Sequence, residues 1–372
     1  MRRSHVTTLV PLLVLSCFCW NEFLVYYVSF WLSCQWPAAP DGQPPPTKQA
    51  ACLRTLVLSD THILGRKRGH FFDRLRREWQ MYRSFVTADT LFQPDAVLVL
   101  GDLLDEGLIA SDEDFAAYVQ RFHSVIPIRE QTKSIVLVGN HDIGFHDRVL
   151  YFEPKLRQRF EKAFNASLVQ VDHIPHSSHN YTFVSINSMA LEGDGCSLCS
   201  QAEARVRRVG ESLSRVDQRP ILLSHFPLFR TSDESCGEAD SADEEDKGIP
   251  FRPSVDCISE ESSELLISSL KPRLVLVGHT HNGCILRHRF AGVEVTEHTV
   301  ASFSWRNRAN PSFLLLSVCP TDVLVSKCFV PNEWLVILVY TGVSFAIMAL
   351  GAWSTRSLDW SLEGKHLNPK SA

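Results

Sequence analysis

Five short apolar runs recur along the chain, separated by longer amphipathic stretches. The runs are rich in Val, Ile and Leu and too short for helices, which is typical of strands buried on both faces of a sheet. The alternation therefore predicts a layered α/β domain with sheets inside and helices outside. The expected strands are Leu53–Leu58, Ala96–Leu100, Ile135–Val138, Ile221–Leu223 and Leu274–Val277, and the expected helices are Phe71–Leu91, Phe115–Ile126, Ala202–Val216 and Glu260–Leu270.

Two segments near the ends are more apolar than the rest. Leu335–Trp353 runs for 19 residues without a charge, close to the roughly 20 residues that cross a bilayer as a helix. Val6–Trp36 is also apolar, but Pro11 and the pair Asn21–Glu22 interrupt it. We interpret it as an uncleaved membrane anchor, and a cleaved signal peptide is the alternative.

Basic residues flank both apolar segments on their outer sides, which favours a cytoplasmic location for both ends of the chain. These residues are Arg2 and Arg3 before the first segment and Arg356, Lys365 and Lys370 after the second. The long intervening domain would then be luminal or extracellular. Two glycosylation sequons, at Asn165 and Asn180, agree with this orientation.

The chain of 372 residues is long enough for one large domain with additions at each end. Its formal net charge of −5 lacks the basic footprint of a nucleic-acid binder. Residues 232–248 are acidic and poor in apolar side chains, so we expect a solvated surface loop there. The expected parts are 1–36, a cytoplasmic tip and membrane anchor; 37–50, a Pro-rich linker; 51–331, the luminal domain; 334–354, a transmembrane helix; and 355–372, a cytoplasmic tail.

Eight cysteines lie between Cys52 and Cys328, and an oxidising compartment would allow some of them to pair. The sequence does not say which pairs form. Cys196 and Cys199 form a Cys-x-x-Cys pair, but no second such pair follows. The sequence therefore disfavours a zinc knuckle here and favours a disulfide, within the pair or to other cysteines.

Polar residues of the metal-ligand type follow each of the five predicted strands. Because strand carboxyl ends meet at one edge of an open α/β sheet, these residues should form one cluster. Carboxylate, imidazole and amide ligands without thiolate suit Mn, Fe or Zn. Seven candidate ligands are too many for one ion, whereas two ions that share a carboxylate would use them all. Glycines 101, 139 and 278 precede the ligands and permit close backbone approach. In chain order the residues are Asp60, His62, Asp102, Asp105, Asn140, His141, Asp142, His225, His279 and His281.

This series resembles the calcineurin-like metallophosphoesterases, whose five motifs occur here in order from about Leu53 to Asn282. The resemblance implies an α/β four-layer sandwich with two central β-sheets, here carrying a transmembrane helix at each end. It also implies His141 as the general acid and Asp142 as the residue that orients it. For the metals, it implies that Asp60, His62 and His281 bind one divalent ion, that Asn140, His225 and His279 bind the other, and that Asp102 bridges them.

A closer resemblance is to the group within this family that remodels glycosylphosphatidylinositol (GPI) anchors. It rests on four further segments, namely 75–81, 139–146, 193–196 and 302–308, and on the two flanking apolar segments. It implies a Mn²⁺-dependent phosphodiesterase that removes ethanolamine phosphate from the second mannose of the anchor and thereby promotes export from the endoplasmic reticulum to the Golgi. The implied partners are GPI-anchored proteins, the membrane, and cargo receptors or coat proteins, with no nucleic acid.

The same resemblance implies a multi-pass protein of early secretory membranes, with its catalytic domain in the lumen. One departure concerns the C-terminal retrieval signal, because Asn368 replaces a lysine while Lys370 is in place. Arg306 and Arg308 follow the last motif and are candidates to bind substrate phosphate, or else they are structural. Other luminal phosphomonoesterases, nucleotide pyrophosphatases and a non-catalytic GPI-cargo adaptor are the alternative functions.

Overall fold

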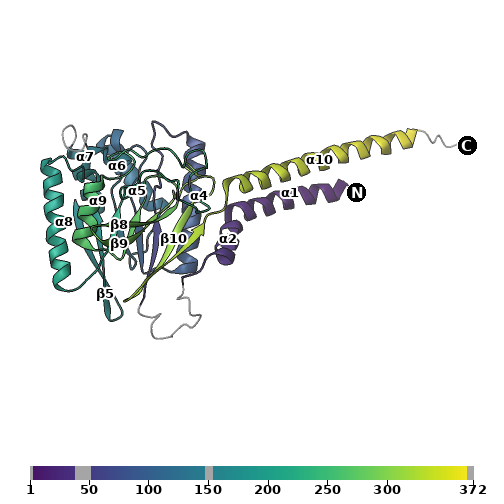
Figure 1. Cartoon of the computed structure of the whole chain (residues 1–372). Coiled ribbons are helices and arrows are strands. Elements are labelled where there is room, and N and C mark those ends of the chain that lie inside the picture. The colour runs from purple at the N-terminus through teal and green to yellow at the C-terminus, as the bar shows by residue number, and fades with distance from the viewer. Residues whose placement is uncertain (1–2, 38–51, 147–153, 367–372) are drawn as a thin grey trace, which may run out of the picture. The chain divides into compact units, whose positions relative to one another are not determined.

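A computed structural model describes residues 3–37, 52–146 and 154–366. It divides into two compact units, one of residues 30–330 and one of residues 1–29 with 331–372 (Figure 1). Nearly all of the linker expected at 37–50 lies outside the described residues. The positions of the retrieval signal, Asn368 and Lys370, also lie outside them.

The first sheet of the larger unit has five strands in the order β11–β10–β1–β2–β3. Its parallel part is built from β1, β2 and β3, while β10 and β11 form an antiparallel hairpin beside β1. The strands are β1 (Leu53–Leu58), β2 (Ala96–Val99), β3 (Lys133–Val136), β10 (Ser312–Val318) and β11 (Val323–Phe329), and the helices α4 (Phe71–Phe92) and α5 (Asp112–Val125) connect the parallel ones.

The second sheet has six strands in the order β4–β5–β6–β7–β9–β8. Its strands β5, β6, β7 and β9 run parallel, and antiparallel strands close both edges. The strands are β4 (Val169–His176), β5 (His179–Ile186), β6 (Ile221–Ser224), β7 (Leu274–Val277), β8 (Cys284–Phe290) and β9 (Val293–Thr299), with helices α7 (Pro154–Phe164), α8 (Ser197–Arg215) and α9 (Glu260–Leu270).

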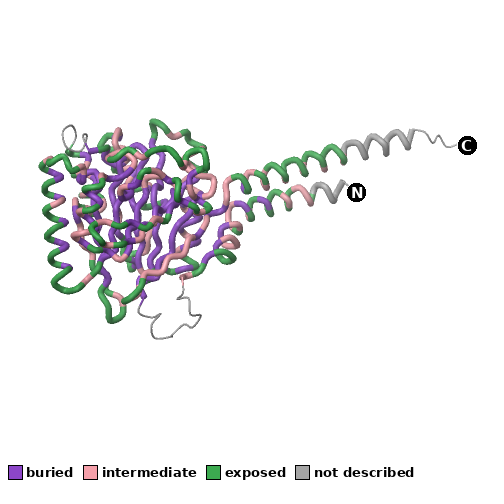
Figure 2. Tube along the Cα trace, in the orientation of Figure 1, coloured by how far each residue is buried: buried purple, intermediate pink, exposed green. Residues whose placement is uncertain are grey.

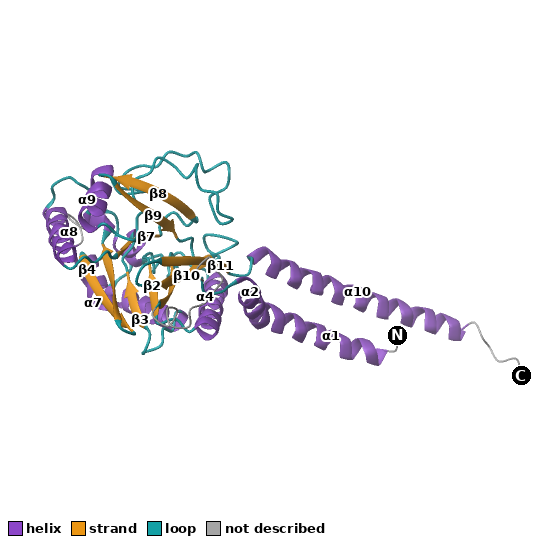
Figure 3. Ribbon diagram, turned by 60° about the horizontal axis from the view of Figure 1, so that its bottom comes forward, coloured by secondary structure: helices purple, strands orange, loops and turns teal. Residues whose placement is uncertain are grey.

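The two sheets pack face to face, and the helices lie outside them (Figure 3). One apolar cluster joins side chains of both sheets, including Val57 and Leu98 from the first and Phe183, Leu223 and Leu276 from the second, all fully buried. Burying each such side chain stabilises the fold by about 1.5–3 kcal/mol. Figure 2 shows the same arrangement as buried strands between helices that are exposed along their outer faces. The predicted sandwich is confirmed.

The five predicted strands are parallel ones that lead into the site, of which β3 lies at the edge of its sheet, and their bounds agree with the sequence to within two residues. The six remaining strands were not predicted. Most of these belong to hairpins at sheet edges, such as β8, where buried and exposed residues are interspersed. Such mixed strands lack a continuous apolar run, whereas β10 is buried throughout and contains one at Phe313–Leu316 that the prediction missed. Helix α7 was also missed.

Two helical stretches are apolar and long enough to cross a membrane: Thr8–Ser33, whose last four residues belong to the larger unit, and Glu333–Ser354. They are built from α1 (Arg3–Cys19), a π-helical turn (Trp20–Leu24), α2 (Val25–Ser33) and α10 (Glu333–His366). Large apolar side chains of α10, among them Leu338 and Phe345, are exposed, which suits contact with lipid. These features indicate an association with a membrane.

The polar interruption of the first apolar stretch has partners within the terminal unit. The hydroxyl of Tyr340 donates a hydrogen bond to the carboxyl of Glu22. Asn21 is buried, and its side-chain amide lies 3.6 Å from the sulfur of Cys17. Polar side chains inside a span are tolerated when they find such partners between helices. Pro11 lies inside α1 without ending it.

Three disulfides tie the larger unit together, joining Cys34 to Cys328, Cys52 to Cys319 and Cys236 to Cys284. The expected pairing of Cys196 or Cys199 is wrong, because both cysteines are free in the structure.

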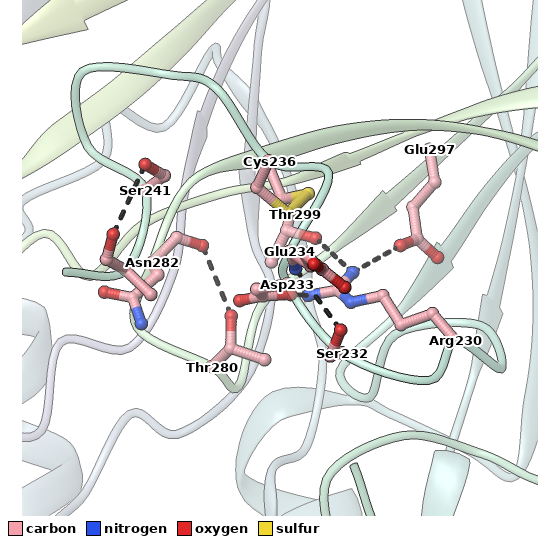
Figure 4. The surroundings of a disulfide bond; sticks show 12 residues. Arg230, Ser232, Asp233, Glu234, Cys236, Ser241, Thr280, Asn282, Glu297 and Thr299 are labelled. Atoms are coloured by element: carbon pink, nitrogen blue, oxygen red, sulfur yellow. Dashed lines mark hydrogen bonds and ion pairs between the residues drawn. A yellow bond between two sulfur atoms is a disulfide. The ribbon is translucent and has the colours of Figure 1, made fainter. Parts of the chain in front are cut away.

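The acidic segment 232–248 is only partly the solvated loop that its composition suggests. Its last acidic residues are exposed, but Asp240 is fully buried. The Asp240 carboxylate accepts a hydrogen bond of 2.6 Å from Ser312 and pairs with Lys327. Figure 4 shows Cys236, whose disulfide to β8 anchors the segment, beside the pair of Arg230 and Glu297. Specific partners in the core therefore override the charge pattern.

Candidate metal centre

The carboxyl ends of five parallel strands, three from the first sheet and two from the second, bring the predicted ligands together. Three groups of potential ligand atoms form there, one of them His62 with Asp105 and His141, and the other two contain the predicted ligands; within each group the atoms lie within 4.8 Å of one another. The two groups of predicted ligands share Asp102, as a bridging carboxylate would require. One group is Asp60, His62, Asp102 and His281, and the other is Asp102, His225 and His279.

Asn140 joins the second group through its amide oxygen, which lies 3.2 Å from Nε2 of His225. It begins a short helix, α6 (Asn140–Ile143), directly after β3 and its extension. The structure therefore places all seven predicted ligands in one cluster with the partition that the resemblance implies. Their binding of ions stays a prediction.

Five of these seven residues have a left-handed backbone, with φ between 44° and 73°: Asp60, His62, Asp102, His279 and His281. Residues other than glycine rarely adopt this conformation, and each instance costs about 1–3 kcal/mol. Such strain collects at sites where the surrounding structure must aim a side chain. Here the sharp turn after each strand directs the ligand into the cluster.

Two of the predicted glycines provide the space for this arrangement. A Cβ atom at Gly139 would lie 2.1 Å from Oδ1 of Asp102, and one at Gly278 would lie 2.0 Å from Oγ of Ser59 and 2.8 Å from Oδ2 of Asp60. All three distances are far below van der Waals contact. Any side chain at these positions would therefore displace a ligand or its support.

The charges of the cluster are balanced by protons when no cation is present. Burial lowers the pKa of His62, but the neighbouring carboxylates of Asp105 and Asp60 outweigh burial and raise that pKa to about 10. The charge of Asp102 likewise outweighs burial at His225 and raises its pKa to about 9. By contrast, burial lowers the pKa of His279 to about 4.

The donor atoms fit divalent ions. Nε2 of His62 lies 3.0 Å from Nε2 of His281, so two ring nitrogens face each other. Nε2 of His279 donates to the carbonyl of Val255 at 2.7 Å, which leaves the buried Nδ1 without a hydrogen-bond partner among the described residues. Oδ1 of Asp60 is similarly without one. Bound cations would satisfy these atoms and replace the protons on His62 and His225.

His141 lies at the edge of the cluster, where it can meet a substrate. Its ring centroid is 4.6 Å from that of His62, its backbone amide donates to Oδ1 of Asp102 at 2.8 Å, and its side chain is 35% exposed. A general acid needs this combination of access and closeness to the reacting atoms.

The predicted contact of Asp142 with the His141 ring is not made. The Asp142 carboxylate is buried and accepts hydrogen bonds from the backbone amides of Gly139, Leu103 and Leu104 at 2.9, 3.3 and 2.9 Å. It thereby holds the turns of the second and third motifs together. Asp142 therefore supports the backbone of the site rather than orienting the His141 ring.

Asp105 takes the place expected for Asp142. Its Oδ1 atom lies 3.7 Å from Nδ1 of His141, 3.5 Å from Nδ1 of His62 and 2.8 Å from Nη2 of Arg306. The spacing Gly-Asp-x-x-Asp pointed to this residue, but the sequence did not assign it a role. In the structure it orients two histidines and one arginine.

The two candidate substrate arginines differ. Arg306 pairs with Asp105 beside His141 and remains 30% exposed, so its guanidinium lies at the site. Arg308 instead donates hydrogen bonds to Asn282, to the carbonyl of Ser241 and to Asn310. These contacts tie Arg308 to the acidic segment and favour its structural interpretation.

A cleft of about 570 Å³ opens beside the second group of ligands. Its walls come from the acidic segment, the residues that follow it and the turn after β7. They include Asp233, Phe251, Arg252, Asp256, His279 and Asn282. A polar substrate could therefore reach His279 from this side.

Comparison with known proteins identifies the family. The model of the calcineurin-like phosphoesterase family matches residues 53–283. Curated relatives include Metallophosphoesterase 1 of Ailuropoda melanoleuca, 41% identical over 91% of this chain and 87% of the relative. Metallophosphoesterase 1 of Xenopus laevis is 42% identical over 89% of this chain and 85% of the relative. The chain therefore belongs to the calcineurin-like phosphoesterases and is a metal-dependent phosphoester hydrolase.

A solved structure agrees on the fold. Purple acid phosphatase PPD1 from yellow lupin (Lupinus luteus) seeds superposes with a TM-score of 0.52 at 13% identity, covering 75% of this chain and 52% of that one. The family and the two ligand groups joined at Asp102 support a centre of two divalent ions.

Proposed function

We propose that this protein is a Mn²⁺-dependent phosphodiesterase that removes ethanolamine phosphate from the second mannose of GPI anchors in early secretory membranes. The observation that carries the reaction type is the pair of ligand groups sharing Asp102 beside an open cleft. The substrate rests on the resemblance of the whole chain to anchor-remodelling phosphoesterases. Removal of this group would promote export of anchored proteins from the endoplasmic reticulum to the Golgi.

A luminal position of the catalytic unit is supported by its covalent chemistry. Disulfides persist in oxidising compartments and are rare in the cytosol, and this unit contains three of them. Both sequon asparagines, Asn165 and Asn180, are exposed and accessible to glycosylation. A catalytic unit tethered to a membrane would meet a lipid-linked glycan at raised effective concentration.

The cleft offers polar groups suited to a glycan phosphodiester. Arg252 and Asp256 pair with each other on the cleft wall, and both face solvent in part. Such pairs can exchange hydrogen bonds with sugar hydroxyls and with an ethanolamine ammonium. Arg306 would contact the phosphate next to His141 because a guanidinium fits phosphate oxygens in a bidentate manner.

The mechanism divides between the ions and the side chains. When bound, two divalent ions would polarise the phosphoryl oxygens and supply hydroxide at neutral pH. His141 would protonate the leaving mannose oxygen, since it is accessible and adjacent to the cluster. Asp105 would hold His141 in position through its backbone carbonyl, which lies 3.4 Å from Nδ1 of the ring, and Arg306 through its carboxylate, which accepts a hydrogen bond of 2.8 Å.

The test is release of ethanolamine phosphate from a purified anchor glycan by the full chain in detergent, after metal removal and return of Mn²⁺. The variants His141→Ala and Asp102→Asn serve as inactive controls. Mn²⁺-dependent release that both variants lose would support the proposal. Cleavage of an aryl phosphodiester without release from the glycan would refute the anchor substrate but keep the reaction type.

Two further outcomes separate the alternative functions. Preference for an aryl phosphomonoester or for a nucleotide pyrophosphate would replace the diesterase assignment with one of those activities. Binding of the anchor glycan without turnover of any of these substrates would indicate a cargo adaptor.

A further inference from the structure

A second cluster of metal-ligand side chains lies apart from the two-metal centre and shares no residue with it. Ligand atoms of His146, Asp194, Cys196 and Cys199 all lie within 4.8 Å of one another. The four residues come from two distant stretches of the chain. His146 lies just beyond α6, whereas the others lie at and before the start of α8.

The histidine is oriented as in metal sites. Nδ1 of His146 lies 2.9 Å from the carbonyl of Met189 and donates its proton there. This bond fixes Nδ1 as a donor and points Nε2 at Oδ2 of Asp194, 3.0 Å away, with a proton between the two atoms that a bound cation would replace. A backbone carbonyl on the far ring nitrogen is the usual support of a metal-binding imidazole.

The thiols are placed by the first turn of α8. Cys196 is the N-cap, and the backbone amide of Cys199 donates to its sulfur at 2.8 Å. The backbone amide of Cys196 donates in turn to Oδ1 of Asp194 at 3.0 Å. These bonds bring both sulfurs and the carboxylate together at the start of α8. A helix N-terminus also favours negative charge, including that of a thiolate.

The dimensions and the burial suit one tetrahedral ion. Zinc bonds of about 2.0–2.3 Å place neighbouring ligand atoms roughly 3.3–3.8 Å apart, so the cluster needs only small shifts to close. Cys199 and His146 are buried, while the side chain of Asp194 is 44% exposed and leaves a path from solvent. Burial raises the pKa of Cys199, so without a cation its thiol keeps the proton that a metal would displace.

We propose that His146, Asp194, Cys196 and Cys199 bind one structural zinc ion. Two thiolates, one imidazole and one carboxylate complete the four-coordinate set that structural zinc prefers. The ion would join the start of α8 to the segment after α6, and so fix the turn that carries Asn140 and His141. A Cys-x-x-Cys disulfide and a plain ion pair of His146 with Asp194 are the competing states.

The test uses the full chain purified in detergent without chelator or reductant. Zinc is counted by elemental analysis and is then released with a thiol-specific mercurial, which acts on thiolate sites and spares a centre built from carboxylates and imidazoles. Cobalt substitution adds a spectrum, since only a thiolate-bound cobalt ion gives sulfur-to-metal charge-transfer absorption. The double variant Cys196→Ser with Cys199→Ser is compared with Cys257→Ser, which removes another buried free cysteine.

Support would be one mercurial-releasable zinc per chain and the cobalt band in the wild type and in Cys257→Ser, both absent from the double variant. Asp194→Asn, which changes a half-exposed side chain, should still fold and should bind zinc more weakly by on the order of tenfold or more, since even outer-sphere partners contribute that much. A Cys196–Cys199 disulfide found by peptide mapping would overturn the proposal. Two free thiols with no releasable zinc and no cobalt band would do so as well.

Discussion

Asp105 offers the sharpest test of how the catalytic cluster is held together. The substitution Asp105→Asn keeps the shape and one acceptor oxygen but removes the charge. That charge lies 2.8 Å from Arg306 and 3.5 Å from the ring of His62, and the carboxylate is almost fully buried. The change should therefore loosen both the metal ligand and the arginine.

The contacts set the size of the effect. A hydrogen bond to a charged group contributes about 1.5–3 kcal/mol, and each 1.4 kcal/mol corresponds to about a tenfold change. Losing the charge that supports His62 and Arg306 should therefore lower kcat/KM by about 10–100-fold, which matches the usual cost of removing a partner behind a metal ligand. The variant should also need a higher Mn²⁺ concentration for half-maximal activity, because the support of the metal ligand His62 is weakened.

The assay follows hydrolysis of an aryl phosphodiester across a Mn²⁺ titration, with thermal melting as a check on folding. Asp112→Asn is the matched control, because it breaks another carboxylate–arginine pair of the same length. The Asp112 carboxylate lies 2.8 Å from Arg159, but its side chain is 83% exposed. Exposed pairs contribute about 0–1 kcal/mol, so this variant should be nearly wild type. If Asp105→Asn changed kcat/KM and the Mn²⁺ requirement no more than Asp112→Asn does, the positioning role of Asp105 would be refuted.

Three further predictions concern the same centre. His141→Ala should lower kcat by about 10²–10⁴-fold while elemental analysis still finds both ions, and loss of the ions instead would contradict a role as general acid. Gly139→Ala should release metal, because its methyl group would meet Oδ1 of Asp102 at 2.1 Å; a fully loaded variant would be the contrary result. The affinity for metal should increase as pH rises between about pH 6 and pH 8. The raised pKa values of His62 and His225 mean that binding displaces their protons, so the affinity should rise by up to about tenfold per pH unit for each proton displaced. Competition with a chelator measures this dependence, and a pH-independent affinity would count against it.

The sequence predicted the part of the fold that builds the centre, for a physical reason. Central parallel strands are covered on both faces, so each appears as an unbroken apolar run such as Leu274–Val277, and its ligand follows at once. Edge hairpins such as β8 and β9 mix buried and exposed residues, and nothing in the local pattern separates them from loops. The ligands were thus found through the strands that precede them.

Contacts between distant segments could not be predicted. Asp142 and Asp105 are both acidic and both close to His141 in sequence or in motif, yet only the packed turns decide which one reaches the ring. Composition assigned Asp240 to solvent, but Lys327 and Ser312 enclose it. Likewise, the lack of a second cysteine pair argued against a metal site at Cys196 and Cys199, whereas the fold places His146 and Asp194 beside them.

The backbone of the centre explains why fold and metals should depend on each other. Five ligand residues hold left-handed backbone conformations, at about 1–3 kcal/mol each. Together that strain is comparable with the roughly 5–15 kcal/mol by which a typical domain is stable. Part is offset by packing, but the metal-free cluster also has to keep protons on His62 and His225 and leave the buried Nδ1 of His279 unsatisfied. Ions bound only by the folded chain would relieve these costs and stabilise it in proportion to their occupancy. The turns that aim the ligands are thus preorganised at the expense of the metal-free protein, which is the arrangement expected when the bound ions are a permanent part of the catalytic unit.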